Sequence, residues 1–294
     1  CTNTAIAAMR MTARRNGAAP NPPQDDTPPP AGRQPPADPT PFRIFRGDAI
    51  DQIAAPRQLI KGYLSIGTVA LLIGPSEAGK STIAVDMANK VAQHYGVLYV
   101  AGEDGANVRA QIRAWELLHN KPRSRNLALV DGPVLLNNDT QVSTFISAAR
   151  TMAPRLIVID TLSSCIPGVD ENSSDMSHIT FNLNRISDEL GAVVLVLHHP
   201  LKYDGETFRG HSSLLNNTHT MLVVSHDEGD ETVLLKVTRH KGKRAAPTTM
   251  RLIVRSTDIF DPDEGILSAP VALPANRVLV NDDYLSVRQT AILQ

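Results

Sequence analysis

Short apolar runs alternate with amphipathic stretches along most of the chain, from about residue 43 to residue 224. The runs cover residues 69–73, 97–101, 127–130, 156–159, 192–197 and 221–224, and they resemble strands that are covered on both faces. Between them, apolar residues recur with helical spacing near residues 81–95, 106–119, 140–152 and 175–190. This alternation predicts an α/β fold with a mainly parallel sheet and helices on both faces.

The pattern changes after about residue 220. Residues 232–238 and 250–254 are again strand-like, but no helical pattern lies between them. Two strands that follow each other without a helix are typical of a β-hairpin. We therefore expect a C-terminal antiparallel β extension at the edge of the parallel sheet.

A glycine-rich signature lies between the first apolar run and the helical stretch that follows it. It reads Gly74, Pro75, Ser76, Glu77, Ala78, Gly79, Lys80, Ser81 and Thr82, a complete G-x-x-x-x-G-K-[ST] phosphate-binding loop. The glycines let backbone N–H groups surround a phosphate, and the helix N-terminus adds partial positive charge. Lys80 would reach the β- and γ-phosphates of a nucleoside triphosphate, and the Ser81 hydroxyl would ligate Mg²⁺. A plain glycine turn before a helix with an exposed lysine is the weaker alternative, because the flanking strand and helix are what the motif requires.

Two of the apolar runs end in acids. Asp160 follows residues 156–159 in the form of a Walker B element, and at the carboxyl end of a parallel strand it would help to hold the Mg²⁺ shell. Glu103 and Asp104 follow residues 97–101. Hydrolysis needs a group that orients or deprotonates the attacking water, so we predict Glu103 as the base and Asp104 as the N-cap of the next helix. A purely capping role for both acids stays open.

His198 and His199 end the run at residues 192–197. Adjacent residues of a strand point to opposite faces, so the pair is poorly placed to bind one metal ion. We interpret one histidine as a sensor of the γ-phosphate and the other as packed beneath it. The densest basic cluster covers residues 236–244. Cations at a hairpin tip can reach a neighbour's phosphates, and a solvated basic face is the alternative reading.

Composition limits the location and the partners. The net charge of −1 creates no overall field that attracts nucleic acid or anionic membranes, so such contacts need local patches. Cys1 and Cys165 are too few for a disulfide framework or a zinc site. No apolar run approaches the roughly 18 residues that cross a membrane. We expect a soluble, cytoplasmic protein with no membrane contact.

The two ends of the chain differ from its middle. Residues 1–42 hold ten of the 21 prolines and predict a disordered leader, with a docking arm for a partner as the alternative. The chain begins with Cys and residues 285–294 read like an unfinished helix, which suggests truncation at both ends; a lipid-modified N-terminal Cys is a second reading of the start. We expect residues 43–260 to form the nucleotide-binding domain and residues 261–294 a C-terminal extension.

Taken together, these residues resemble the RecA-like P-loop ATPases, and within them the RepA-type plasmid replicative helicases of the AAA-family group. The resemblance implies a RecA-like fold, ATP and Mg²⁺ as cofactors, and a ring that is typically a hexamer. It also implies Glu103 as the catalytic carboxylate, His199 as the γ-phosphate sensor, and a hairpin cation, Arg239 or Lys241, that acts on the next subunit's nucleotide. Ring helicases commonly place Lys-x-Arg in this hairpin, so which cation acts stays open. The similarity runs from about residue 57 to residue 254 and is carried by residues 74–82, 99–105, 156–163, 170–172, 198–199 and 209–214.

Three functional hypotheses follow. The first is an ATP-driven ring ATPase, a DNA helicase or replication protein of plasmid, phage or mobile-element type, which acts on single-stranded DNA. The second is a non-helicase ATPase switch that regulates a partner in recombination or DNA metabolism. Aromatic residues make up only 4% of the chain, so few side chains are available to stack on the bases of single-stranded DNA. This keeps the second hypothesis open. A small-molecule kinase is a third and weaker alternative.

Overall fold

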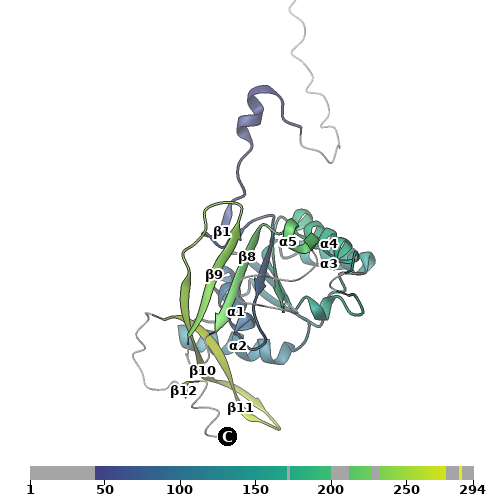
Figure 1. Cartoon of the computed structure of the whole chain (residues 1–294). Helices are drawn as coiled ribbons and strands as arrows, with labels where there is room; N and C mark the ends of the chain where they lie inside the picture. The colour runs from purple at the N-terminus through teal and green to yellow at the C-terminus, as the bar shows by residue number, and fades with distance from the viewer. Residues whose placement is uncertain (1–43, 171–172, 200–211, 227–231, 276–284, 287–294) are drawn as a thin grey trace, which may run out of the picture. The chain divides into compact units, whose positions relative to one another are not determined.

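A computed structural model describes residues 44–170, 173–199, 212–226, 232–275 and 285–286 of the chain (Figure 1). The chain divides into two units, Cys1–Ile53 and Ala54–Gln294. In the first unit the described part forms a 3-10 helix, η1, at Gly47–Gln52. The proline-rich leader predicted at residues 1–42 lies outside the described residues. The second unit contains all the other described helices and strands.

The second unit is built on a ten-stranded sheet with the order β11-β10-β9-β8-β3-β7-β6-β4-β5, and β12 pairs with β10. Its six parallel strands are β3 (Val69–Ile73), β4 (Gly96–Ala101), β5 (Leu127–Asp131), β6 (Pro154–Asp160), β7 (Val193–His198) and β8 (Thr220–His226). A small antiparallel pair, β1 (Gln58–Ile60) and β2 (Leu64–Ser65), precedes β3. The predicted α/β fold with a mainly parallel sheet is confirmed.

Helices cover both faces of this sheet. They are α1 (Lys80–Ala92), α2 (Gly105–His119), α3 (Asp139–Arg150), α4 (Met176–Leu190) and α5 (Ser212–Asn217), with a short 3-10 helix, η2, at Ser163–Cys165. Figure 1 shows α3, α4 and α5 together on one side of the sheet, away from α1 and α2. Among the described helices, none has the length and apolar character needed to cross a membrane.

The strands are apolar on both faces because each face has its own core. On one face Leu72 of β3 belongs to the same buried cluster as Ile83 and Met87 of α1. On the other face Leu71 of β3 is clustered with Leu183 of α4. Burial on both sides explains why these strands read as continuous apolar runs instead of alternating ones.

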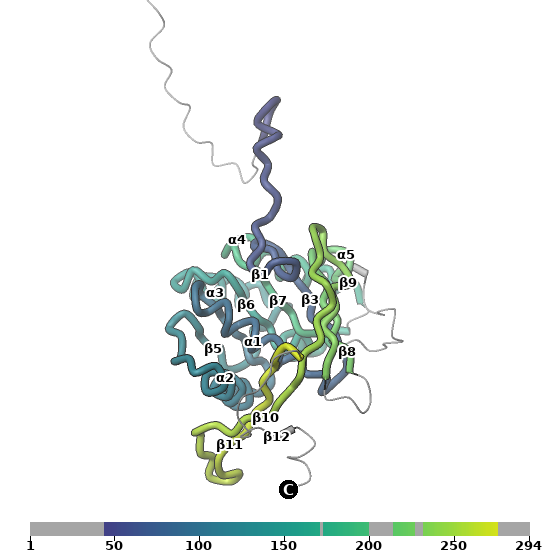
Figure 2. Tube along the Cα trace, turned by 90° about the vertical axis from the view of Figure 1, so that its left-hand side faces the viewer, coloured from purple at the N-terminus to yellow at the C-terminus, as the bar shows by residue number. Residues whose placement is uncertain are grey.

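The antiparallel part of the sheet consists of β9 (Thr232–His240), β10 (Thr248–Asp261), β11 (Gly265–Pro274) and β12 (Leu285–Ser286). β9 pairs with β8 and with β10, so the predicted antiparallel extension is confirmed. β11 pairs along most of β10 and thereby extends the same sheet beyond residue 260. Figure 2 shows this β10–β11 hairpin beside α2.

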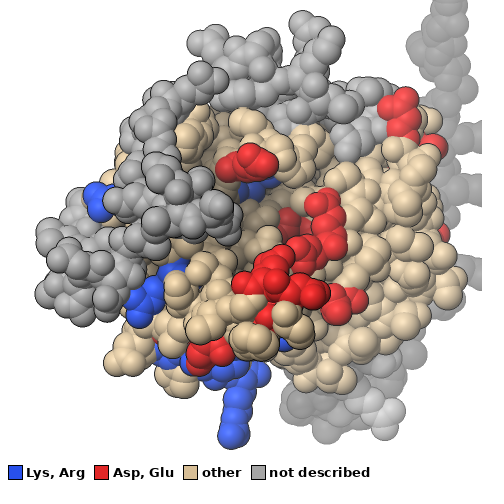
Figure 3. Space-filling model, turned by 90° about the horizontal axis from the view of Figure 1, so that it is seen from below, with Lys and Arg blue, Asp and Glu red and all other residues tan. Residues whose placement is uncertain are grey.

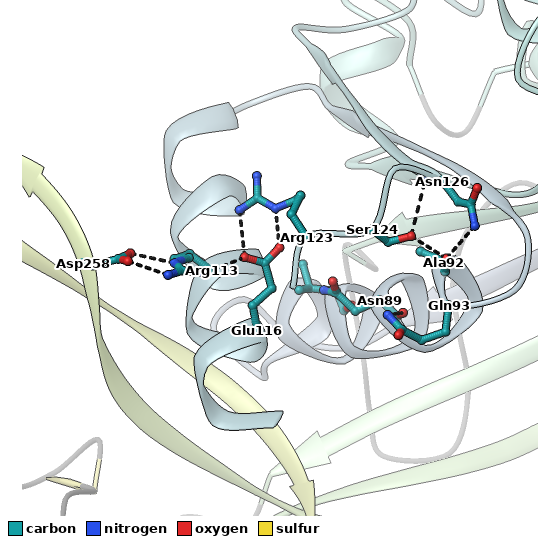
Figure 4. A network of polar contacts seen from close by, with 10 residues as sticks. Asn89, Ala92, Gln93, Arg113, Glu116, Arg123, Ser124, Asn126 and Asp258 are labelled. Atoms are coloured by element: carbon teal, nitrogen blue, oxygen red, sulfur yellow. Dashed lines mark hydrogen bonds and ion pairs between the residues drawn. The ribbon is translucent and has the colours of Figure 1, made fainter. Parts of the chain in front are cut away.

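The β10–β11 hairpin is fastened to α2 by an apolar cluster and by an ion pair. Trp115 of α2 is buried with Ile253 of β10 and Val271 of β11. At the edge of this cluster, the Arg113 guanidinium donates to both carboxylate oxygens of Asp258, at 2.6 and 2.5 Å (Figure 4). The hairpin therefore continues the sheet and packs against α2.

Candidate nucleotide-binding site

The phosphate loop joins the end of β3 to the start of α1, as the sequence predicts. Gly79 is the N-cap of α1 with φ 82°, a left-handed conformation that favours glycine. A Cβ atom at Gly79 would lie 2.5 Å from Cδ1 of Leu252, and one at Gly74 would lie 2.6 Å from the Val224 carbonyl oxygen. The left-handed backbone thus favours glycine at position 79, and the neighbouring backbone carbonyl of Val224 favours glycine at position 74.

Lys80 folds back over the loop. Its ammonium donates to the carbonyl oxygens of Gly74, at 3.0 Å, and Pro75, at 2.6 Å, and it lies 3.0 Å from Nδ1 of His199. Burial lowers the pKa of Lys80 to about 8, although the nearby carboxylates of Asp160 and Glu103 oppose the shift. The structure therefore places a desolvated cation at the centre of the loop, where a phosphate would be stabilised most strongly.

His199 shares the lysine's environment. Burial, and next the charge of Lys80, lowers the pKa of His199, so the ring is neutral at pH 7. An ammonium can only donate, so Nδ1 of His199 accepts its hydrogen bond and the ring proton resides on Nε2. His198, the preceding residue, is buried, and burial lowers its pKa to about 4. His199 thus keeps one N–H for a group that enters the loop.

Asp160 ends β6 at the level of the loop. β7 lies between β6 and β3, so the acid and the loop belong to strands separated by one neighbour. Its Oδ2 accepts a hydrogen bond from the Tyr99 hydroxyl at 2.6 Å, and its carboxyl is also hydrogen-bonded by the Ser81 side chain. Burial raises the pKa of Asp160, and these two hydrogen bonds oppose that shift.

Tyr99 is a member of this site that sequence analysis did not identify. It is fully buried in β4, opposite Val158 of β6, and burial together with Asp160 raises its pKa well above the ordinary value. The available signal was one aromatic hydroxyl within an otherwise aliphatic strand. Its partner became evident only once β4 and β6 were known to be neighbours.

Glu103 and Asp104 follow β4 and have separate partners. The Thr161 hydroxyl donates to Oε1 of Glu103, which places that carboxylate beside the end of β6. Asp104 accepts a hydrogen bond from the backbone N–H of Asn107 at 2.9 Å and is the N-cap of α2, as predicted. The capping role thus belongs to Asp104, and Glu103 is left at the mouth of the site.

A cavity of about 400 Å³ unites these groups. Figure 3 looks from below at the face of the molecule near the carboxyl ends of the strands and shows acidic side chains gathered around a hollow. The cavity is lined by two sets of residues. The first contains predicted site residues, namely Ser76, Glu77, Gly79, Lys80, Ser81, Thr82, Glu103, Asp160 and His199, with Thr161. The second contains Asn107, Gln111, Leu252 and Pro270, none of which sequence analysis singled out.

Ser81 and Asp160 are a suitable pair of ligands for Mg²⁺. A hydroxyl and a carboxylate oxygen already lie within hydrogen-bonding reach of each other. Mg²⁺ prefers oxygen ligands, and it commonly takes only one or two from the protein while it keeps water and phosphate oxygens. The residues present therefore fit the predicted ion, which when bound would neutralise phosphate charge.

Arg239 and Lys241 lie away from the cavity of their own chain. His240 pairs with Thr220, and Thr220 pairs with Ala70 near the start of β3, so these cations are at the amino end of the parallel strands. The Arg239 guanidinium donates to the carbonyl oxygens of Leu215, at 2.5 Å, and Asn216, at 3.3 Å, near the end of α5. Lys241 is exposed. A role in trans stays a prediction for both.

The phosphate loop between β3 and α1, the acid at the end of β6 and the intervening strand β7 define a RecA-like P-loop ATPase fold. A family model described as an AAA domain matches residues 36–205, which is more than half of the chain. The chain belongs to this family of AAA domains.

Curated relatives of the chain include the DNA repair protein RadA. The protein of this name from Pseudomonas aeruginosa is 30% identical over 107 residues, which cover 36% of this chain and 21% of the relative. The one from Mycolicibacterium smegmatis is 28% identical over 193 residues, 62% of this chain and 38% of the relative. The chain thus spans well under half the length of these relatives.

Two solved structures are similar to the chain at low sequence identity. One is an ATPase domain with a TM-score of 0.49 and 15% identity, over 63% of this chain and 81% of that domain. The other is the RadB recombinase, which has a TM-score of 0.49 and 16% identity, over 65% of this chain and 89% of its own.

Proposed function

We propose that the chain hydrolyses ATP in the cavity at the end of β3 and that this hydrolysis drives work on single-stranded DNA. The observation that carries the proposal is the convergence of Lys80, Asp160, Glu103 and His199 on one cavity from four separate segments. These groups match the needs of phosphoryl transfer, which are charge neutralisation, ion binding and placement of the attacking water.

Each residue has a distinct part in the proposed reaction. Lys80 exchanges its carbonyl partners for the β- and γ-phosphates and stabilises the charge that develops on them. Glu103, exposed at the mouth of the cavity, accepts a proton from the attacking water. His199 donates its Nε2 proton to a γ-phosphate oxygen, since Nδ1 is held as an acceptor. Ser81 and Asp160 hold Mg²⁺.

The DNA contact is expected away from the cavity. Glu77, Glu103 and Asp160 line the cavity, and acidic side chains gather on this face of the molecule in Figure 3, so DNA phosphates would be repelled there. At the other end of the parallel strands, Lys241, Lys243 and Arg244 follow β9 and are all exposed. These cations support either contact with DNA or contact with the nucleotide of a neighbouring subunit in a homo-oligomeric, hexameric ring. We place this activity in the cytoplasm, in replication of plasmid, phage or mobile-element type.

ATP hydrolysis measured with and without single-stranded DNA, together with the oligomeric mass, tests the proposal. We expect Mg²⁺-dependent turnover that single-stranded DNA accelerates, in an assembly larger than a dimer. A helicase also separates the strands of a forked duplex. Absence of ATP binding under all conditions would overturn the proposed function as a whole.

A second function is supported by the similarity to DNA repair protein RadA. In this case the ATPase is a switch whose nucleotide state controls a partner in recombination or repair. Nucleotide-dependent assembly or partner binding without strand separation would identify it. The same hydrolysis assay separates the two functions, because turnover that DNA leaves unchanged favours the switch.

A further inference from the structure

A second part of the cavity lining is built by α2 and the β10–β11 hairpin. Asn107 and Gln111, one helical turn apart on α2, supply two carboxamides. Leu252 of β10 and Pro270 of β11 supply apolar surface. We name these four residues the amide wall. Its chemistry is neutral, in contrast to the charged groups that hold the phosphates.

Gln111 has an unsatisfied hydrogen-bond acceptor in this wall. Its side chain lines the cavity although the residue is only 3% exposed. Nε2 of Gln111 donates to Oδ1 of Asn107 at 3.3 Å, whereas Oε1 is itself enclosed and has no hydrogen-bond partner among the residues that the structure describes, so the side chain must turn toward the cavity before a ligand can reach it. A buried carbonyl without a partner is destabilising, so a donor that enters the cavity beside it is bound favourably.

The amide wall is held in place from three sides. The Asp104 side chain caps the backbone N–H of Asn107 and so fixes the first turn of α2, which directly precedes Gln111. Trp115, one turn further along, packs with the hairpin and donates its indole N–H to Asp86 of α1 at 3.0 Å. Figure 4 shows the ion pair between Arg113 and Asp258 that ties α2 to β10. The position of the α2 backbone at Gln111 is therefore fixed before a ligand arrives.

The position of Leu252 relates the amide wall to the phosphate loop. A Cβ atom built at Gly79 would lie 2.5 Å from Cδ1 of Leu252, so Leu252 packs directly against the loop. A nucleoside triphosphate whose phosphates occupy the loop would therefore extend its base along Leu252 and Pro270 toward the carboxamides. Flat apolar rings pack favourably on such side chains, and their polar edges would meet Asn107 and Gln111.

We propose that the amide wall is the nucleobase subsite and that Gln111 Oε1 accepts a hydrogen bond from the exocyclic amine of adenine, so that the site selects ATP over GTP. The inference rests on the proposed ATP-binding function. Guanine carries a carbonyl oxygen where adenine carries this amine, so two acceptors would face each other. Reversing the Gln111 amide would set its Oε1 against Oδ1 of Asn107 unless Asn107 reversed as well, which disfavours the arrangement that guanine needs.

The test compares three ligands that share the triphosphate, namely the β,γ-imido analogues of ATP, GTP and purine riboside triphosphate. The last lacks only the exocyclic amine. With the full chain and Mg²⁺, we expect the ATP analogue to bind about three- to tenfold more tightly than either of the others, the usual worth of one hydrogen bond. This comparison needs no variant and so does not depend on the folding of one.

Gln111→Met then removes the acceptor while it keeps the volume. It should bind all three analogues with nearly equal affinity, and Gln93→Met, the same change at the exposed C-cap of α1, should keep the preference. Equal binding of the three by the unaltered chain, a preference for GTP, or an unchanged preference in Gln111→Met would each overturn the subsite. All of these leave triphosphate binding intact, whereas failure of every analogue to bind would overturn the proposed function instead.

Discussion

The two ends of the cavity are built on different principles. At the phosphate end, Lys80, Asp160 and Glu103 are charged or titratable, and they lie within a few residues of the carboxyl ends of parallel strands. At the other end, Asn107 and Gln111 are neutral, and the remaining surface is apolar. The phosphate end is suited to stabilise the charge that develops during hydrolysis. The neutral end is suited to recognise the shape and polarity of the ligand.

This difference separates chemistry from selection. Substitutions at the phosphate end are expected to change binding of the triphosphate or its turnover, whatever base is attached. Substitutions in the amide wall are expected to change which nucleotide binds and to leave the chemical step nearly unaltered. The comparison would be wrong if a substitution at the phosphate end changed the base preference, or if one in the amide wall changed the rate of the chemical step.

Lys80→Ala should have the largest effect. The variant loses the desolvated ammonium at the centre of the loop, and we expect ATP turnover to fall by a factor on the order of 10³, with weaker binding of ATP and GTP alike. The measurement is hydrolysis over a range of nucleotide concentrations. Lys121→Ala, at an exposed lysine after α2, is the matched control. Turnover within tenfold of the unaltered chain would show that Lys80 is not the main group that stabilises the phosphates.

Glu103→Gln should separate binding from chemistry. The amide keeps the size of the side chain but cannot accept the proton of the attacking water, so turnover should fall by about 10²- to 10³-fold while ATP affinity changes little. Single-turnover hydrolysis together with equilibrium binding measures both quantities. This result would identify Glu103 as the general base and not as a helix-capping residue.

Asp104→Asn provides the comparison for that result. Asn is as good an N-cap as Asp, so α2 and the amide wall that it carries should be unaffected, and turnover should remain within about twofold. If Asp104→Asn abolished hydrolysis and Glu103→Gln did not, the two acids would exchange roles.

The phosphate end could be predicted from the sequence because each of its residues belongs to a pattern that is recognisable within a short stretch of the chain. Residues 74–82 form one continuous motif, and Asp160 and Glu103 each end an apolar run that was recognisable as a strand. Parallel strands bring their carboxyl ends to one edge, so the motif and the acids had to meet. No knowledge of the strand order was needed for that inference.

The amide wall could not be predicted in the same way. Gln111 and Pro270 are far apart in the sequence and meet because β10 and β11 return across α2. Neither residue type carries a signature, and the apolar spacing of α2 gave no sign that a carboxamide would be buried there. Tyr99 was missed for a related reason, because its partner Asp160 depends on β4 lying next to β6.

Residues next to the phosphate end should also make the free energy of unfolding depend on pH, whereas the amide wall should not. Burial lowers the pKa of His198 to about 4 from an ordinary value of 6.5, so the unfolded chain binds the proton more readily. The neutral form therefore stabilises the fold fully above about pH 6.5, and this contribution is lost as the pH falls toward 4. It corresponds to about 3 kcal/mol, measurable by denaturant unfolding at several pH values.

His198→Gln should remove that dependence between pH 4 and 6.5. The four residues of the amide wall do not titrate, so Gln111→Met should retain the full slope of unfolding free energy against pH. An equal slope in His198→Gln and the unaltered chain would show that other groups control the acid response.

The smallest effect is expected where the amide wall is tied to α2 from outside. Asp258 accepts two hydrogen bonds from Arg113, yet its side chain is 60% exposed, and ion pairs in water contribute little. Asp258→Asn should shift nucleotide affinity by less than about twofold and keep any preference for ATP, because the buried cluster around Trp115 still holds the hairpin. The titration with the three imido analogues measures this directly. A loss of base preference in Asp258→Asn, with Lys80-dependent turnover unchanged, would mean that the hairpin is positioned by its charges and that the neutral end of the cavity depends on ion pairs after all.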